Sequence, residues 1–419
     1  MRAGKSYLLE SKKSWIQTVF LILVDGNSMY KRVMKIMSMP ENIEKWLHYC
    51  IKCNNCKTVY KKYLPSCPSG EKFLFETYWA SGRIKTAKAL IEGNLDFNDE
   101  VLHGLFACTT CGACEIQCQA PHQEHIIDLI EATRELIVKK LGNPEKKQEL
   151  LEKYIKDKTR LNPYNEFHSD NSSIKEKYDL EDEAEYVYYI GCTSNYRQKR
   201  IRDATLEFFK KIGLNFTVID EVCCGSPLLR TGQKTIIKNI IEHNLKQIKK
   251  TGAKTIITSC AGCFRTLKKD WKKLGIDYDF KVIHTCELVS DLLENKEINL
   301  KKIDKVATYH DPCHLGRHMG IYEEPRKILR AIFGKNFIEM ETNRENTWCC
   351  GAGGGVKIAY ADWSLEIAEK RIKDALATEA SYLTSTCPFC FRNLQEAIQL
   401  NKNEIEMIDI IELVNEMVK

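Results

Sequence analysis

The chain has 419 residues, a formal net charge of +6 and 43% hydrophobic residues, as expected of a globular protein with two or three domains. Its 19 cysteines are unusual, and in so long and lysine-rich a chain they exclude a small secreted disulfide scaffold. The positive charge is not accompanied by a base-stacking motif beside a basic stripe, so we expect no nucleic-acid partner.

Residues 1–45 form an N-terminal extension that matches no known motif. The run SWIQTVFLILVD within it is strongly apolar, but it is about half as long as a membrane-spanning helix. No small-residue cleavage site follows, which argues against a signal peptide. We expect a buried or interfacial helix here, and docking to a membrane surface or a partner is the alternative.

Residues 46–143 contain two cysteine motifs typical of ferredoxins, CIKCNNCKTVYKKYLPSCP and CTTCGACEIQC. Each has C-x-x-C-x-x-C and a later fourth cysteine, which in two-cluster ferredoxins binds the other cluster. The sequence therefore predicts a mostly α-helical, ferredoxin-like domain with two cubane [4Fe-4S] clusters. The ligands would be Cys50, Cys53, Cys56 and Cys118 for the first cluster, and Cys108, Cys111, Cys114 and Cys67 for the second.

Residues 144–184 are polar and charged, and we interpret them as a linker between domains. The remaining chain consists of two similar units, 185–300 and 301–419. In each unit, short β-branched or aromatic runs alternate with amphipathic helical stretches, which indicates an α/β fold with a parallel sheet. The cysteines follow the strand-like runs, at the sheet edge where α/β proteins collect ligands.

Both units contain a single cysteine, then a C-C-G motif, then C-x-x-C, at matched spacing. The cysteines are Cys192, Cys223, Cys224, Cys260 and Cys263 in the first unit, and Cys313, Cys349, Cys350, Cys387 and Cys390 in the second. Adjacent Cα atoms are ~3.8 Å apart, below the ~4.4 Å lower limit for a disulfide, so neighbouring cysteines are poor partners for each other.

Five thiolates exceed the four of a zinc site or an ordinary cubane. We therefore predict an opened, non-cubane [4Fe-4S] cluster in each unit, with the adjacent cysteines gripping neighbouring irons. Four ligands with a free reactive thiol, or zinc in one unit, remain alternatives. Cys286 is left over, and a buried thiol is its simpler explanation.

We do not expect the stretch CCGAGGG to bind a nucleotide. Val356 stands where a dinucleotide fingerprint needs Gly or Ala, and no Walker lysine follows. With no flavin or nicotinamide motif either, a partner would have to deliver or accept electrons.

From about Tyr49 onward, the chain resembles the D-type subunit of heterodisulfide reductase. The resemblance rests on the doubled cysteine unit behind two ferredoxin motifs, and on GCTSNYRQ, CCGSPLLRTGQ, YHDPCHLGRHMGIYEEPR and NRENTWCCGAGGG. DsrK-type subunits and the iron–sulfur subunits of glycolate and lactate oxidases are related to that family.

This resemblance implies that two cubanes feed two non-cubane clusters, which split a disulfide, above all the coenzyme M–coenzyme B heterodisulfide. It also implies an electron donor, either a membrane haem b subunit or a soluble flavoprotein. The expected location is cytoplasmic, with peripheral attachment to the inner face of the membrane through a partner. The alternative is an electron-transfer subunit of a flavin-dependent glycolate or lactate (2-hydroxy acid) dehydrogenase, or of a DsrK-type sulfur-metabolism complex.

A heterodisulfide carrying sulfonate and phosphate groups needs basic side chains at the mouth of its site. Arg197, Arg230 and Arg317 lie in suitable loops, although a surface salt bridge is the alternative role for each. Near Cys313, a histidine could protonate a departing thiolate or hydrogen-bond to cluster sulfur. The histidines concerned are His310, His314 and His318.

Overall fold

The computed structural model describes residues 40–419. The apolar run and most of the predicted N-terminal extension lie outside these residues. Within the described part of the chain, no helix is both long and apolar enough to cross a bilayer.

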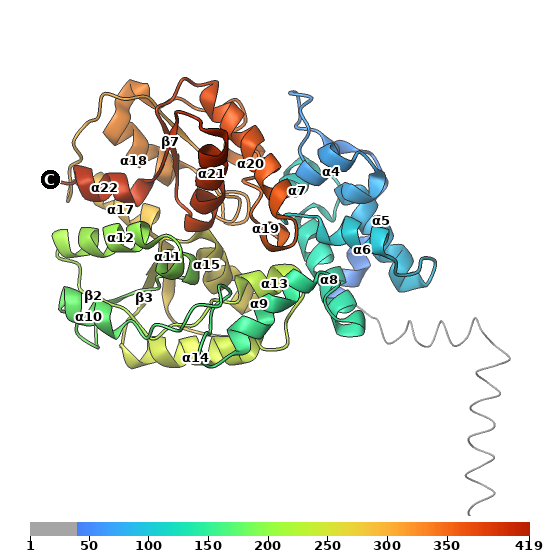
Figure 1. The fold of residues 1–419 in the computed structure, drawn as a ribbon, viewed down its shortest axis with the longest axis horizontal. Helices are drawn as coiled ribbons and strands as arrows, with labels where there is room; N and C mark the ends of the chain where they lie inside the picture. Colours follow the sequence, from blue (N-terminus) through green and yellow to red (C-terminus); the bar gives the residue numbers. More distant parts are fainter. Residues whose placement is uncertain (1–39) are drawn as a thin grey trace, which may run out of the picture.

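The first part of the described chain is helical and lies to one side of the molecule, shown in blue to cyan in Figure 1. Local signals explain its helix ends: the Asn98 side chain accepts a hydrogen bond from the Val101 N–H, and Gly93 ends a helix with φ 73°. Its α-helices are α3 (Glu41–Glu44), α4 (Pro68–Phe73), α5 (Ala80–Glu92), α6 (Asp99–Phe106), α7 (Ala113–Gln117) and α8 (Ile126–Leu141).

The polar segment 144–184 packs on the rest of the protein. It contains α9 (Lys146–Lys156) and α10 (Ser172–Tyr178). Helix α9 contacts α13 (Ser226–Thr231) of the first repeat and α19 (Val356–Ala359) of the second. Leu151 and Ile155 on α9 are buried in the main hydrophobic core. The few apolar residues of this segment thus fix it against the repeats.

The first repeat contains a four-stranded parallel sheet in the order β2-β1-β3-β4. Its strands are β1 (Tyr186–Tyr188), β2 (Phe216–Thr217), β3 (Thr255–Thr258) and β4 (Lys281–His284). Its helices are α11 (Cys192–Tyr196), α12 (Lys199–Lys211), α13 (Ser226–Thr231), α14 (Ile237–Lys250), α15 (Ala261–Arg265), α16 (Trp271–Lys273) and α17 (Thr285–Glu294), with a π-helical turn between α15 and α16.

The second repeat has a three-stranded parallel sheet in the order β5-β6-β7. A parallel bridge between Ala307 and Phe337 adds a pairing beside β5 at the place that β2 takes beside β1. The strands are β5 (Ala307–Tyr309), β6 (Tyr382–Ser385) and β7 (Glu406–Asp409). The helices are α18 (Glu323–Phe333), α19 (Val356–Ala359), α20 (Ala361–Leu376), α21 (Pro388–Asn401) and α22 (Ile410–Met417).

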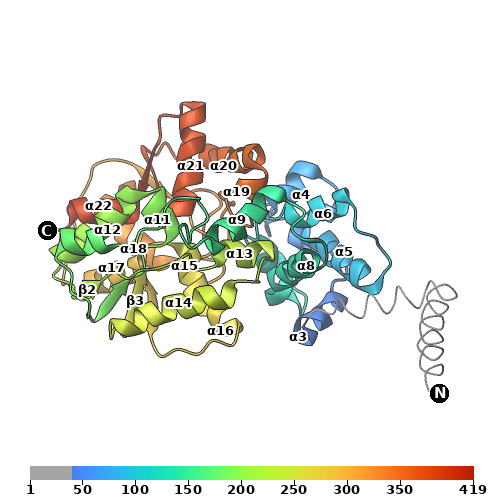
Figure 2. The same ribbon diagram turned by 60° about the horizontal axis from the view of Figure 1, so that its bottom comes forward.

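Helices of the two repeats pack directly on one another. Helix α12 lies on α22, and α17 contacts both α18 and α22, so that one hydrophobic core runs through both repeats. Figures 1 and 2 show the repeats side by side, with the helical region against one end of the pair. The α/β fold of the repeats and the helical fold of the N-terminal region are as predicted.

Candidate metal centres

Two cavities in the helical region are lined by the cysteine sets that the crossed ferredoxin pattern predicts. All 19 cysteines lie within the described residues, and none is in a disulfide. The first cavity is lined by Cys50, Cys53, Cys56 and Cys118. The second is lined by Cys67, Cys108, Cys111 and Cys114. Binding of iron by these sets stays a prediction.

The two cavities differ in their exposure to solvent. Cys53 at the first cavity is exposed, whereas Cys108, Cys111 and Cys114 at the second are buried. Burial raises the pKa of the Cys114 thiol well above its usual value, because a thiolate loses its hydration there. Several such thiols become thiolates together only when a cation compensates their charge, and this requirement fits an iron–sulfur cluster.

Backbone and side-chain donors support charge on these sulfurs. The Thr110 N–H lies 3.3 Å from the Cys108 Sγ, and the Ala120 N–H lies 3.5 Å from the Cys118 Sγ. The buried Arg83 places its Nη1 3.9 Å from the Cys67 Sγ. Donors to ligand sulfur stabilise negative charge on a cluster, so these groups are suited to that role.

The five cysteines of the first repeat meet at the carboxyl edge of its sheet. Thiol–thiol contacts run in sequence through Cys192, Cys223, Cys224, Cys263 and Cys260. Gly191, with φ +80°, makes this approach possible, because an ideal Cβ there would lie 2.9 Å from the Cys263 Sγ.

The second repeat has a matching arrangement. Contacts run through Cys349, Cys350, Cys390 and Cys387. Burial raises the pKa of the Cys313 thiol to about 12, with charges on Cys111 and Cys350 adding to the effect. Five soft sulfur donors therefore lie at one site in each repeat, all of them buried except the partly exposed Cys192 and Cys313, and this donor set suits iron–sulfur clusters or zinc.

Two contacts join these sites into one series. The thiols of Cys260 and Cys387 are neighbours across the boundary between the repeats. The thiols of Cys111 and Cys349 are neighbours between the second ferredoxin-like cavity and the second repeat. The order in space is thus the second cavity, the second repeat and then the first repeat.

The adjacent cysteines of each pair are electrostatically unequal. Hydrogen bonds from neighbouring thiols lower the pKa of Cys224 and of Cys350 well below the usual value. In the first repeat, contacts with Cys192 and Cys224 raise the pKa of Cys223. Without a cation the five thiols share their protons, so the site accommodates all five as thiolates only around a metal cluster.

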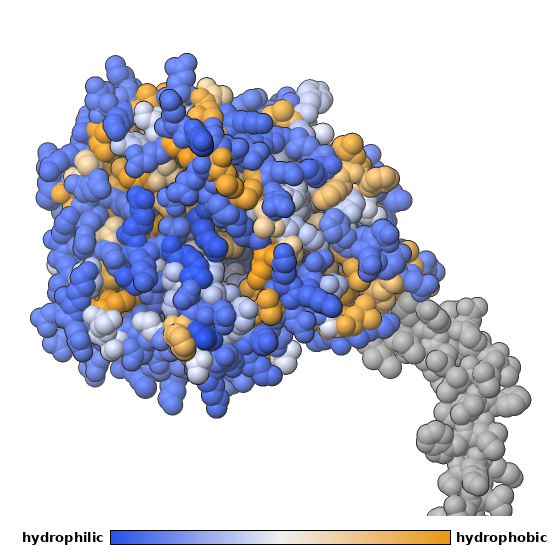
Figure 3. Space-filling view, in the orientation of Figure 1, coloured by the Kyte–Doolittle hydropathy of each residue, from blue (hydrophilic) through white to orange (hydrophobic). Residues whose placement is uncertain are grey.

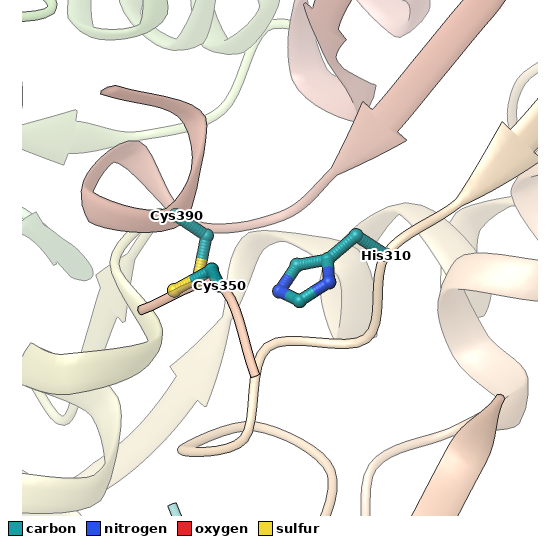
Figure 4. A group of neighbouring side chains, drawn as sticks. All are labelled: His310, Cys350 and Cys390. Carbon is teal, nitrogen blue, oxygen red and sulfur yellow. The ribbon is translucent and has the colours of Figure 1, made fainter. Parts of the chain in front are cut away.

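The three histidines near Cys313 have different surroundings. His310 forms a group with Cys350 and Cys390 whose potential ligand atoms lie within 4.8 Å of one another (Figure 4). His314 lies near the first repeat, with its Nε2 3.3 Å from Nη1 of Arg265. His318 donates from Nε2 to the Thr110 carbonyl oxygen at 3.1 Å and so ties this loop to the helical region.

Burial keeps these imidazoles neutral. It lowers the pKa of His310 to about 3, and the charge of Arg371 adds to the effect. It also lowers the pKa of His314 and His318 well below the usual value. A neutral imidazole carries one N–H donor and one acceptor, so its hydrogen-bond partners decide what it presents to the cysteines.

The three arginines predicted to bind substrate are placed differently from one another. Arg230 is 3% exposed and forms ion pairs with Glu131 and Asp270. Arg317 is partly buried and donates to the carbonyl oxygens of Cys111 and Thr347, each at 2.7 Å. Protein groups thus engage both side chains, although Nη2 of Arg317 is buried without a partner among the described residues.

Arg197 keeps 29% of its side chain exposed and pairs with Glu166 at 2.7 Å. Arg197 is therefore accessible to solvent and to a bound anion, whereas Arg230 is not. Substrate binding by Arg197, Arg230 and Arg317 stays a prediction.

Sequence reasoning missed buried polar residues that hold the site together. The Glu221 carboxylate accepts hydrogen bonds from the N–H groups of Ile190 and Gly191 at 2.9 and 2.6 Å, and burial raises its pKa to about 8. Arg83 and Arg134 are 1% and 0% exposed. The one available signal was an arginine on the apolar face of a helix, which is uncommon unless the charge has partners.

Family models match the regions that contain these sites. A model described as a cysteine-rich domain matches residues 186–268 and 307–395, and a 4Fe-4S dicluster domain matches residues 46–121. These ranges lie within the predicted segments 46–143, 185–300 and 301–419. The exact domain boundaries stay predictions.

Curated relatives match along most of the chain. The D subunit of dihydromethanophenazine:CoB–CoM heterodisulfide reductase from Methanosarcina mazei is 38% identical over 394 residues, which are 88% of this chain and 93% of the relative. The protein of the same name from Methanosarcina acetivorans is 38% identical over 392 residues, again 88% and 93% of the two chains. The B subunit of fumarate reductase (CoM/CoB) from Methanothermobacter marburgensis is 30% identical over 388 residues, 90% of this chain and 74% of that one.

Among solved structures, a hypothetical protein from Helicobacter pylori superposes with a TM-score of 0.53 at 10% identity. The match covers 93% of this chain and 74% of that one, and it supports the fold alone. The two cysteine-rich repeats, the dicluster region and the extent of the identity agree with one another. The chain belongs to the family of heterodisulfide reductase D subunits and is an iron–sulfur oxidoreductase subunit.

Proposed function

We propose that this chain reduces a small-molecule disulfide, the coenzyme M–coenzyme B heterodisulfide, using four [4Fe-4S] clusters. Two are cubanes in the helical region, and two are non-cubane clusters in the repeats. The observation that supports this proposal best is the series of thiol contacts that links Cys111 to Cys349 and Cys387 to Cys260. The names of the Methanosarcina relatives include this heterodisulfide.

The reaction consumes two electrons and two protons. The S–S bond breaks, each sulfur gains one electron and one proton, and two thiols leave. The clusters would supply the electrons and Lewis-acidic iron for the developing thiolates. The facing positions of Cys260 and Cys387 place the two five-cysteine sets next to each other, as a substrate with two sulfurs requires.

The remaining residues bind and orient. Arg197 suits an anionic group of the substrate, because a guanidinium matches the geometry of sulfonate, carboxylate or phosphate. Arg230 and Arg317 fix the loops around the clusters through the protein groups they contact. Electrons would enter at the first cavity, where Cys53 is exposed.

The electron donor would be a partner protein, either a membrane haem b protein or a soluble flavoprotein. In the former case the chain would be attached peripherally to the cytoplasmic face of the membrane. Leu74 and Phe75, which directly follow α4, are exposed, and Figure 3 shows apolar atoms over α4. Such apolar atoms suit a docking surface.

Anaerobic purification followed by metal analysis and a viologen assay tests this function. We expect about 16 iron atoms per chain, four for each of four clusters, and no stoichiometric zinc. Reduced viologen should then be oxidised by the heterodisulfide with the purified chain alone. A colourless, iron-poor protein with reactive thiols in both repeats would contradict the proposal.

A second candidate is an electron-transfer subunit of a larger redox complex. It is favoured by the match to the B subunit of fumarate reductase (CoM/CoB) over 90% of this chain. Full iron content without viologen oxidation, together with co-purification of a flavoprotein, would support this second candidate over the first.

A further inference from the structure

We propose that His310 donates a hydrogen bond to sulfur of the cluster in the second repeat. Arg371 would fix the imidazole as the Nε2–H tautomer. The hydrogen bond would give this cluster a higher reduction potential than the cluster in the first repeat. The two non-cubane sites would then be unequal despite their matching cysteines. This inference rests on the proposed function, since it requires an iron–sulfur cluster in each repeat.

The backbone holds His310 rigidly at the end of β5. Its N–H donates to the Thr384 carbonyl oxygen at 2.9 Å, and its own carbonyl oxygen accepts from the Ser385 hydroxyl at 3.2 Å. The side chain is buried, at 1% exposure. Figure 4 shows the imidazole edge directed toward Cys350 and Cys390, so the ring has a defined orientation toward the sulfurs.

Arg371 determines which ring nitrogen carries the proton. Its Nε lies 3.2 Å from Nδ1 of His310. A guanidinium has donors but no acceptor, so Nδ1 must accept and therefore carries no proton. The proton of the imidazole is then on Nε2. Arg371 is itself held by the Thr342 carbonyl oxygen at 2.8 Å and by Asp374 at 3.3 Å.

The Nε2–H has no partner in the part of the chain that the structure describes. It is buried, and no hydrogen bond is formed there by any described residue. Buried N–H groups in proteins are nearly always paired, so a partner outside the polypeptide is expected. A sulfur atom of a cluster held by Cys350 and Cys390 would supply the acceptor.

The equivalent residue in the first repeat lacks this donor. Tyr189 is the third residue before Cys192, as His310 is before Cys313. Its hydroxyl donates to the Val222 carbonyl oxygen at 2.6 Å and is thereby satisfied within the protein. Tyr189 lies near Cys224 and Cys263, the counterparts of Cys350 and Cys390. At this position the two repeats thus differ in one hydrogen-bond donor, although the neighbouring thiols match.

An N–H dipole directed at sulfur stabilises added negative charge and so favours the reduced cluster. The second repeat should therefore be reduced at a higher potential than the first. The second repeat is also the one that adjoins the cubane region, because Cys111 contacts Cys349. The first electron to pass the cubanes would then reside at the second repeat.

The test is an anaerobic redox titration, followed by electron paramagnetic resonance, of the wild-type protein and three variants. His310→Leu should lower the midpoint potential of one non-cubane cluster and leave the other clusters unchanged. His310→Gln, whose amide can still donate, should restore most of the shift. Tyr189→Phe is the matched control and should change neither potential. An unchanged potential in His310→Leu, or loss of one cluster's iron in both His310 variants, would overturn the proposal.

A measurement on the wild-type protein covers the case in which His310→Leu fails to fold. After exchange into deuterated buffer, electron–nuclear double resonance should detect an exchangeable proton coupled to one non-cubane signal but not to the other. Equal coupling at both, or at neither, would overturn the hydrogen bond. If the wild-type protein lacks non-cubane signals and the matching iron, the proposed function itself fails, and the two failures are thereby distinguished.

Discussion

Arg134 on helix α8 places its Nη1 2.9 Å from the carbonyl oxygen of Gly354, which follows the cysteine pair of the second repeat. The same guanidinium donates to the carbonyl oxygens of Arg230 in the first repeat and Cys108 in the helical region, each at 2.7 Å. An ideal Cβ on Gly354 would lie 2.2 Å from the Cys108 oxygen. One buried cation thus fixes all three cysteine-bearing regions relative to one another.

Replacing Arg134 by Lys should destabilise the protein by about 3 kcal/mol or more. Lysine cannot reach all of these carbonyl oxygens, and buried acceptors without partners are costly. Anaerobic denaturant unfolding, followed by tryptophan fluorescence and cluster absorbance, measures the loss. Arg330→Lys, an exposed side chain paired with Glu323, is the control and should change stability by less than about 0.5 kcal/mol. Equal stabilities for the two variants would refute the bridging role.

Cys118→Ser should lower the iron content by about four atoms per chain, or leave a labile first cluster, because serine is a poorer ligand for this soft site. Cys286→Ser should leave the iron content unchanged. Cys286 is buried beside Nδ1 of His284, at 3.2 Å, and belongs to none of the predicted ligand sets. Iron analysis and electron paramagnetic resonance check both variants. Loss of iron in Cys286→Ser would show that a ligand set is wrong.

Asp409→Asn should stabilise the protein more at pH 8 than at pH 5. Asp409 caps α22 through Oδ1, while Oδ2 is buried and has no partner among the described residues. Burial, then the charge of Glu412, raises the pKa of Asp409 well above its usual value. The folded state therefore favours the protonated acid, and stability falls as the pH rises above the unfolded pKa of about 4.

Asparagine keeps the capping oxygen and removes this charge. Melting temperatures at the two pH values measure the effect. Asp182→Asn, at a carboxylate that is 91% exposed, is the control and should show no comparable gain. A gain for Asp409→Asn that is the same at pH 5 and pH 8 would argue against a raised pKa.

Arg197→Gln should raise the KM for an anionic disulfide about three- to tenfold with little effect on kcat or stability, as the loss of one exposed charge-assisted contact would. Arg202→Gln, which removes a nearby arginine paired with Asp203, is the matched control. The viologen assay supplies both constants. An unchanged KM in Arg197→Gln would exclude this side chain from substrate binding.

Much of the fold could be predicted because its signals are local. Alternating strand-like and amphipathic runs specify the parallel sheets, and the crossed ferredoxin pattern groups Cys67 with Cys108, Cys111 and Cys114 around one cavity. This holds even though the spacing from Cys56 to Cys67 is longer than in ordinary ferredoxins. A turn in the chain absorbs the added residues, with a bridge between Thr58 and Pro65.

The relations between the sites could not be predicted in the same way. The contacts of Cys260 with Cys387 and of Cys111 with Cys349 depend on how separately formed units pack, which no local pattern encodes. The surroundings of Arg230 could not be predicted either. Its position beside a cysteine pair in the sequence suggests that it binds substrate. Its partners Glu131 and Asp270 come from distant segments of the chain.

The exposure of Cys53 determines where oxidation by air would begin. Dioxygen would reach the first cavity before the buried cysteines of the repeats, so oxidative damage would start at the first cavity. A briefly aerated sample should then lose its response to a natural donor while small artificial dyes still drive turnover. Such a sample would look inactive in one assay and competent in another.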